Sequence, residues 1–204
     1  MIPPGYLAAF EAGGGVKIRV LFVEGGASLL SELGTPHTMD GWVEVLNEKI
    51  STQLKSAEII NWFGNGGNFI LSASADEADK AKRLIINSKE RLLYTVSLSE
   101  LYLYINQARL IIEKQCKEDK WLVYGFAFKL KGRKQYFDDY SPKEGYIVKC
   151  MKPGVALIVI KKENTNVKRG FVSSLLSCDS DDKWAIRSIA ELDGVFRVAL
   201  EIFN

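Results

Sequence analysis

The chain has 204 residues, of which 47% are apolar and 25% charged, the balance of a globular protein with one or two hydrophobic cores. Its formal net charge of +2 is too small to indicate a nucleic-acid-binding protein from composition alone. No segment reaches the roughly 20 apolar residues of a membrane span, and Met1 to Tyr6 lack the charged and apolar regions of a signal peptide. The three cysteines are widely spaced and form no Cys-x-x-Cys pair, and the chain has one histidine. We therefore expect reduced cytoplasmic thiols and no zinc site.

The first strand and helix are predicted after a glycine-rich start. Residues 1–16 include three consecutive glycines and are expected to form a flexible linker. The β-branched, apolar run from Lys17 to Glu24 predicts a buried strand. Asp40 is a good residue to cap a helix, and apolar residues follow it at helical spacing as far as Leu54.

A β-hairpin is the clearest local signal in the sequence. Strand-like runs from Ala57 to Phe63 and from Phe69 to Ser74 flank the segment Gly64 to Asn68, whose Asn-Gly and Gly-Gly steps suit a tight turn. An amphipathic helix is expected over Asp76 to Leu93, and a closing strand over Glu100 to Ile105. The resulting order predicts an α+β, ferredoxin-like (split βαβ) fold with two helices on one face of an antiparallel sheet.

The predicted domains follow from this order. Residues 17–106 form a palm of the polymerase and cyclase type, residues 107–150 a connector of helix and hairpin, and residues 151–204 an incomplete second palm-like segment. Within the last segment, Val155 to Ile160 predicts a strand and Lys183 to Phe203 a final helix. Since the chain ends before a second palm would reach its own hairpin, we expect the natural subunit to continue beyond Asn204.

Two segments together resemble the large palm-domain subunit of type III, or type I-D, CRISPR effector complexes. In Ile18 to Ile105, the run Gly64-Asn65-Gly66-Gly67-Asn68-Phe69 is similar to the first-palm hairpin of that family. In Val155 to Phe203, Glu163 matches the first acid of the second-palm motif, while Thr165 replaces the second acid. The resemblance implies a crRNA-guided antiviral complex with other effector subunits, crRNA and target RNA as partners.

The glycine hairpin is the candidate nucleotide site. Glycines let the backbone approach a ligand closely and expose amide donors, so Gly64, Asn65, Gly66, Gly67 and Asn68 are the candidate residues, with a hairpin that binds no ligand as the alternative. In the family that the chain resembles, the first palm completes a composite ATP site.

Metal-dependent catalysis has only weak support in the sequence. An active palm holds divalent metals such as Mg²⁺ with paired carboxylates, whereas Glu24 and Glu163 have no acidic neighbour in their motifs. We therefore expect a non-catalytic scaffold. Two alternatives stay open: a divergent nucleotide cyclase that makes cyclic oligoadenylate from ATP as a dimer with Glu24 and Glu163 as metal ligands, and a generic ferredoxin-like interaction module.

Cations and aromatic rings alternate around Gly132. Basic residues bind phosphates and aromatic rings stack on bases, so the candidate RNA-binding residues are Lys131, Arg133, Lys134, Tyr136 and Phe137. A solvated surface loop is the alternative interpretation of the same segment.

Overall fold

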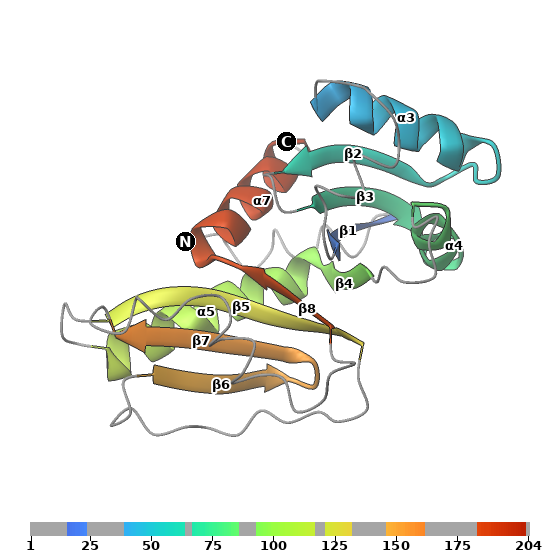
Figure 1. Cartoon of the computed structure of the whole chain (residues 1–204). Coiled ribbons are helices and arrows are strands. Elements are labelled where there is room, and N and C mark those ends of the chain that lie inside the picture. Colours follow the sequence, from blue (N-terminus) through green and yellow to red (C-terminus); the bar gives the residue numbers. More distant parts are fainter. Residues whose placement is uncertain are drawn as a thin grey trace. The chain divides into compact units, whose positions relative to one another are not determined.

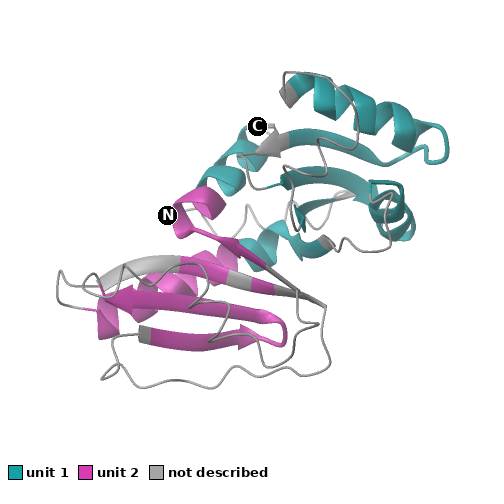
Figure 2. Ribbon diagram, viewed as in Figure 1, with its two compact units in different colours: residues 1–101, 194–204 teal, residues 102–193 magenta. Residues whose placement is uncertain are grey.

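The computed structural model describes residues 16–23, 39–63, 67–85, 93–116, 121–131, 146–161 and 183–202 (Figure 1). The chain divides into two compact units, one of residues 1–101 and 194–204 and one of residues 102–193 (Figure 2). The described elements are β1 (Val16–Val23), α3 (Met39–Ser51), β2 (Glu58–Phe63), β3 (Asn68–Ser74), α4 (Ala75–Ile85), β4 (Leu93–Ser97), α5 (Leu98–Gln115), β5 (Trp121–Lys131), β6 (Tyr146–Lys152), β7 (Val155–Lys161), β8 (Lys183–Arg187) and α7 (Ile189–Ile202).

Unit 1 has the predicted ferredoxin-like topology. Its four strands lie in the order β2-β3-β1-β4, and every neighbouring pair is antiparallel. α3 follows β1 and α4 follows β3, as the split βαβ arrangement requires. The α+β, ferredoxin-like fold predicted from the hydrophobic periods is therefore confirmed.

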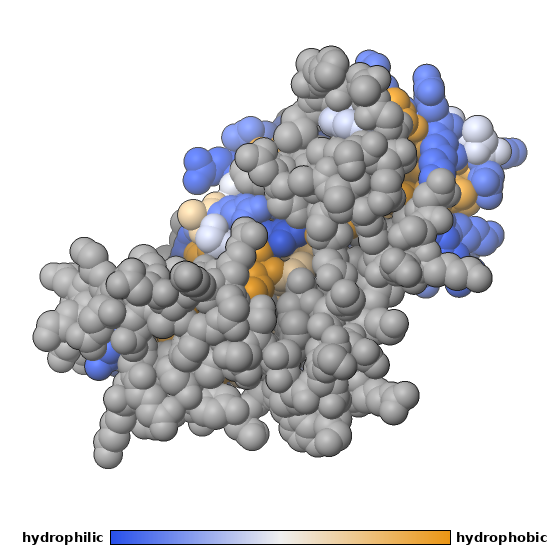
Figure 3. Space-filling model, in the orientation of Figure 1, coloured by the Kyte–Doolittle hydropathy of each residue, from blue (hydrophilic) through white to orange (hydrophobic). Residues whose placement is uncertain are grey.

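One face of this sheet packs against α3 and α4. Alternate residues of β1 and β3 meet the apolar faces of the two helices in one buried cluster. The outer surface around α4 is mostly hydrophilic (Figure 3). The cluster consists of Leu21, Val23, Trp42, Leu46, Ile50, Leu54, Ile59, Phe69, Leu71, Ala73, Ala78, Ala81 and Ile85.

The second face of the same sheet is also buried. Val20, Phe22, Ile70 and Val96 point away from that cluster and have no solvent exposure. Unit 1 also contains residues 194–202 of α7, which include further buried apolar side chains (Figure 2). This sheet is thus enclosed on both sides rather than half-solvated.

Unit 2 contains a second four-stranded antiparallel sheet. Its strand order is β6-β7-β5-β8. Counted along the chain within each unit, both sheets therefore have the order second, third, first, fourth. Within unit 2, the ring of Tyr104 in α5 lies 6.2 Å from that of Phe126 in β5, and Phe128 follows at 6.3 Å. The sequence assigned β5 to a connector, but its pairing with both β7 and β8 puts it in the middle of the sheet.

Two predicted elements have the wrong type. Residues 100–105 were expected to form a strand and instead lie in α5, while the closing strand is β4. Residues 183–187 were expected to start a helix and form β8, which pairs with β5. In both places a Ser-x-x-Glu sequence marks the true start of the helix, as described below. No helix among the described segments is long and apolar enough to cross a membrane.

Candidate functional site

The end of β1 and the tip of the β2–β3 hairpin meet, as the palm-type interpretation requires. The backbone N–H of Val23 donates to the carbonyl of Gly67 at 2.9 Å, and Phe22 lies opposite Asn68 in the sheet. Gly67 has a φ of +76°, a value that glycine adopts without strain. Glu24 follows Val23 directly in the chain but lies outside the described residues.

Asn68 is enclosed by the protein. Its side chain has no solvent exposure, and it shares the second face of the sheet with Phe22 and Ile70, which are equally buried. A buried amide is normally satisfied by hydrogen bonds within the protein. A nucleotide would reach this amide only after the residues that cover this face had moved.

Most of the other predicted site residues lie outside the described part of the chain. This holds for Gly64, Asn65 and Gly66 in the hairpin, for Glu163, and for Arg133, Lys134, Tyr136 and Phe137. Lys131 is the last residue of β5, at the beginning of the segment that carries the other four candidates for RNA binding. Nucleotide binding at residues 64–68, metal binding at Glu24 and Glu163, and RNA binding at residues 131–137 therefore stay predictions.

The described residues contain no group of three or more histidines, cysteines, aspartates or glutamates that could hold a metal ion. Cys116 and Cys150 are free thiols, and Cys178 lies outside the described residues.

A polar hollow of about 350 Å³ lies beside the connection from α3 to β2, lined among others by Asn47, Ser56, Glu58 and Ser72. Asn47 extends from α3 to the edge strand β2 and satisfies both backbone groups of Ile59. Its Nδ2 donates to the Ile59 carbonyl at 2.7 Å, and the Ile59 N–H donates to its Oδ1 at 2.7 Å. The amide side chain thus pairs with the edge of β2 as a neighbouring strand would, next to a bulge between Ile59 and Asn61.

A carboxylate of α4 holds the same connection. Glu77 accepts hydrogen bonds from the hydroxyl and backbone N–H of Ser56 and from the backbone N–H of Lys55. The hydrogen bonds from Ser56 are the main reason why the pKa of Glu77 is lowered from its ordinary value. Asn47 and Ser56, which line the hollow, are therefore committed to holding the chain, which gives them a structural role.

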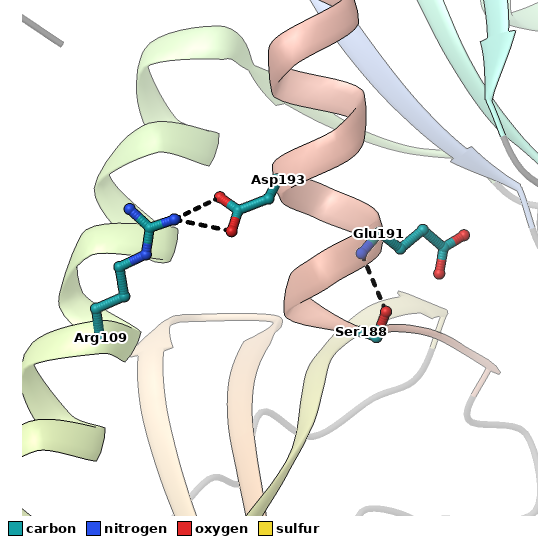
Figure 4. Close-up of polar contacts among 4 residues, drawn as sticks. All are labelled: Arg109, Ser188, Glu191 and Asp193. Atoms are coloured by element: carbon teal, nitrogen blue, oxygen red, sulfur yellow. Dashed lines mark hydrogen bonds and ion pairs between the residues drawn. The ribbon is translucent and has the colours of Figure 1, made fainter. Parts of the chain in front are cut away.

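A second cluster of polar contacts lies at the start of α7, within unit 2. Arg109 of α5 donates from Nη2 to both carboxylate oxygens of Asp193, at 2.9 and 2.8 Å, and Ser188 accepts the backbone N–H of Glu191 (Figure 4). The largely buried Arg187 approaches Glu191 at 3.8 Å and donates to the Ile186 carbonyl. These contacts fix the corner between β8 and α7.

Gly125 allows this corner to lie close to β5. Its φ is +136°, and a Cβ at this position would lie 1.9 Å from the carbonyl oxygen of Arg187. β5 has a bulge here, between Val123 and Gly125. No other residue fits a backbone approach of this kind without displacement.

Sequence reasoning missed the signal that starts three helices. Ser74, Ser97 and Ser188 each cap a helix, and a glutamate three residues later completes a Ser-x-x-Glu pattern. At Ser97 the exchange is reciprocal, because its backbone N–H donates to the Glu100 carboxylate while its hydroxyl accepts the Glu100 N–H. The pattern is visible in the sequence and would have located α5 and α7.

No protein-family model matches the chain, and neither a curated protein nor a solved structure matches it significantly. The functional interpretation therefore rests on the residues and the fold.

Proposed function

We propose that the chain is a non-catalytic, palm-type scaffold of a crRNA-guided antiviral complex, which contacts RNA, ATP and other effector subunits in the cytoplasm. The observation that carries the proposal is the pair of four-stranded antiparallel sheets with the same strand order. The resemblance to the CRISPR large subunit implies two palm-type domains, but it takes Val155 to Ile160 as the first strand of the second palm, whereas this segment is the third strand, β7, of the second sheet. Because the ferredoxin-like topology serves many functions, the assignment needs a direct test of binding.

The hairpin favours a scaffold over an enzyme. An active palm usually carries metal-binding acids on this hairpin, and metals need carboxylate ligands that a substrate can reach. Here the first residue of β3 is the neutral Asn68, whose amide is fully buried beside Phe22. A residue in this environment stabilises the sheet, and the hairpin then serves to shape the end of the domain.

The decisive experiment measures RNA binding at several salt concentrations. In a filter-binding assay with single strands of crRNA length, replacing Lys131, Arg133 and Lys134 with alanine should weaken binding. The slope of log affinity against log salt should flatten by up to about one unit for each lost phosphate contact.

The control variant removes three exposed cations from described helices, Lys80, Lys114 and Arg197. It has the same net charge as the triple variant at residues 131–134, so it should retain both the affinity and the slope. Equal behaviour of the two variants would contradict a site around Gly132. A chain that binds neither RNA nor ATP would instead support the generic interaction module.

One observation keeps the nucleotide cyclase as a second candidate. The hydrogen bond from Val23 to Gly67 joins the end of β1 to the hairpin, and Glu24, which lies outside the described residues, follows β1 in the chain, at the sequence position where an active palm holds its first metal ligand. Incubation of the protein with ATP and Mg²⁺ or Mn²⁺ tests this candidate. Formation of cyclic oligoadenylate that disappears in the Glu163→Gln variant would establish the cyclase and refute the scaffold.

A further inference from the structure

Among the residues of unit 1 that the structure describes, two buried polar atoms have no hydrogen-bond partner. They are Nε of Arg19, in β1, and Oγ1 of Thr95, in β4. Each atom has almost no contact with solvent, so water at the surface does not satisfy it. Since buried polar atoms in native proteins nearly always have a partner, these two atoms on adjacent strands offer a ligand hydrogen-bonding groups that the protein itself leaves unused.

The two side chains lie on the same face of the sheet. Leu21 is opposite Thr95 in the pairing of β1 with β4, and Arg19 is two residues from Leu21, so all three share one face. Leu21 belongs to the core under α3 and α4, which identifies this face as the one opposite to Asn68. Diagonal neighbours of this kind are about 7–8 Å apart, a separation that one group with several oxygens can bridge.

The chemistry of the two atoms defines the kind of ligand that would suit them. The guanidinium of arginine is always charged and has only donors, so Arg19 requires an acceptor and is stabilised best by an anion. The hydroxyl of Thr95 can donate a second hydrogen bond to the same group. Arginine forms its strongest contacts with planar or tetrahedral oxyanions, because its donors lie in a fixed fork.

The neighbouring charges favour an anion. Lys82 of α4 pairs with Asp79 at 2.6 Å. Through this hydrogen bond and its charge, Lys82 lowers the pKa of Asp79, and the charges of Arg19 and Arg83 lower it further. The charges of Lys82, Arg19 and Arg83 thus all act on the carboxylate of Asp79. The carboxylate of Glu100, in the first turn of α5, accepts hydrogen bonds from Ser97 at the end of β4.

We propose that Arg19 and Thr95 form a binding site for a phosphate group between β1, β4 and α4. The site is independent of the scaffold function, because it lies on the face of the sheet away from the hairpin amide. A phosphate group supplies enough acceptor oxygens for both orphan atoms and the negative charge that the surrounding cations select. Inorganic phosphate and the phosphate of a nucleotide share this chemistry.

Calorimetric titration of the full chain with inorganic phosphate, and separately with AMP, at constant ionic strength tests the site. Saturable binding of either compound is the expected result. Tighter binding of AMP would identify a nucleotide ligand, and equal binding would identify the phosphate group alone as the recognised element. If neither compound binds saturably, the proposal is wrong.

Three variants separate a specific site from general electrostatic attraction. Thr95→Val keeps the shape of the side chain but removes the hydroxyl, and Arg19→Gln removes the charge and the fork. Each should weaken phosphate binding about 10-fold or more, which is typical for a lost hydrogen bond to a charged group. Lys80→Gln removes an exposed cation of α4 that does not act on Asp79 and should change binding less than about threefold.

The stability of the unligated protein provides an independent measurement. Thr95→Val removes a buried hydroxyl that has no partner, so the variant should unfold at the same or a higher urea concentration than the parent chain without phosphate. Added phosphate should stabilise the parent chain more than the variant. A Thr95→Val variant that is less stable than the parent chain without phosphate, or equal loss of binding in Lys80→Gln, would overturn the assignment.

Discussion

Replacing Asn47 should test how the edge of the first sheet is held. In the Asn47→Ala variant both backbone groups of Ile59 lose their partner, and each of the two lost hydrogen bonds spans 2.7 Å in the native protein. A hydrogen bond contributes a net 0.5–1.5 kcal/mol to stability, so we expect the free energy of unfolding to fall by about 1–3 kcal/mol. This is a large part of the roughly 5–15 kcal/mol that stabilises a domain, and urea denaturation followed by circular dichroism would measure it.

The Asn47→Asp variant distinguishes hydrogen bonding from packing. The carboxylate still accepts the Ile59 N–H, but it has no donor for the Ile59 carbonyl and brings a negative charge close to that oxygen. At neutral pH this variant should therefore also be destabilised. Below the pKa of the new carboxyl the protonated acid can donate again, so the stability deficit relative to the parent chain should shrink as the pH falls.

A nearby control is Ser51→Ala. Ser51 is exposed and bonds only to the carbonyl of Glu48 in its own helix, so its removal should change stability by less than about 0.5 kcal/mol. An Asn47→Ala variant as stable as this control would refute the reasoning. Water from the adjacent polar hollow would then replace the amide at no cost, and the edge of β2 would not depend on α3.

Three further predictions concern the helix corners and connections. Because hydrogen bonds lower the pKa of Glu77 in the folded protein, its ionised form stabilises the fold above the ordinary carboxyl pKa, and this contribution is lost as the pH falls through the lowered value. Glu77→Gln should therefore be less stable than the parent chain at pH 7 and equal to it in acid. Urea unfolding midpoints between about pH 3 and pH 7 would measure this difference. Gly125→Ala forces a Cβ to within 1.9 Å of the carbonyl oxygen of Arg187 at a φ of +136°, so thermal unfolding should reveal a loss of about 3 kcal/mol or more, and a near-native melting curve would contradict the close approach. Ser97→Ala should cost about 0.5–2 kcal/mol in chemical denaturation, whereas no loss would mean that Glu100 alone caps α5.

Hydrophobic periodicity predicted much of the first unit correctly. The strand from Lys17, the helix after Asp40 and the hairpin around Gly67 correspond to β1, α3 and the β2–β3 pair within a few residues. These elements have local signals: alternating or continuous apolar runs, a polar residue at the helix start, and glycine at the turn. The residue types alone determine such signals, so no tertiary information was needed.

The errors came from segments whose local preference conflicts with a stronger signal. Residues 100–105 contain leucine, tyrosine and isoleucine and favour a strand by propensity, but the reciprocal hydrogen bonds between Ser97 and Glu100 start a helix directly after β4. Residues 183–187 form a strand because they pair with β5, more than fifty residues earlier in the chain. Such long-range pairing leaves little trace in a local pattern.

The candidate sites depend even more on distant contacts. The sequence indicated the position of Asn68 at the hairpin but not its burial, which requires a cover on the second face of the sheet. The sequence did not single out Arg19, because a single cation within an apolar run is usually interpreted as a solvated residue. Only the register of β1 with β4 brings it next to Thr95.

Two strand-to-helix corners of unit 1, β3 to α4 and β4 to α5, have no connecting residues, and this restricts how the chain can change in length. β3 ends at Ser74 and α4 begins at Ala75, while β4 ends at Ser97 and α5 begins at Leu98. One residue inserted between Ser74 and Ala75 would rotate α4 by about 100° relative to its cap. The rotation would turn Ala78, Ala81 and Ile85 away from the core and bring charged side chains toward it. Insertions and deletions at this corner should therefore be excluded in related proteins.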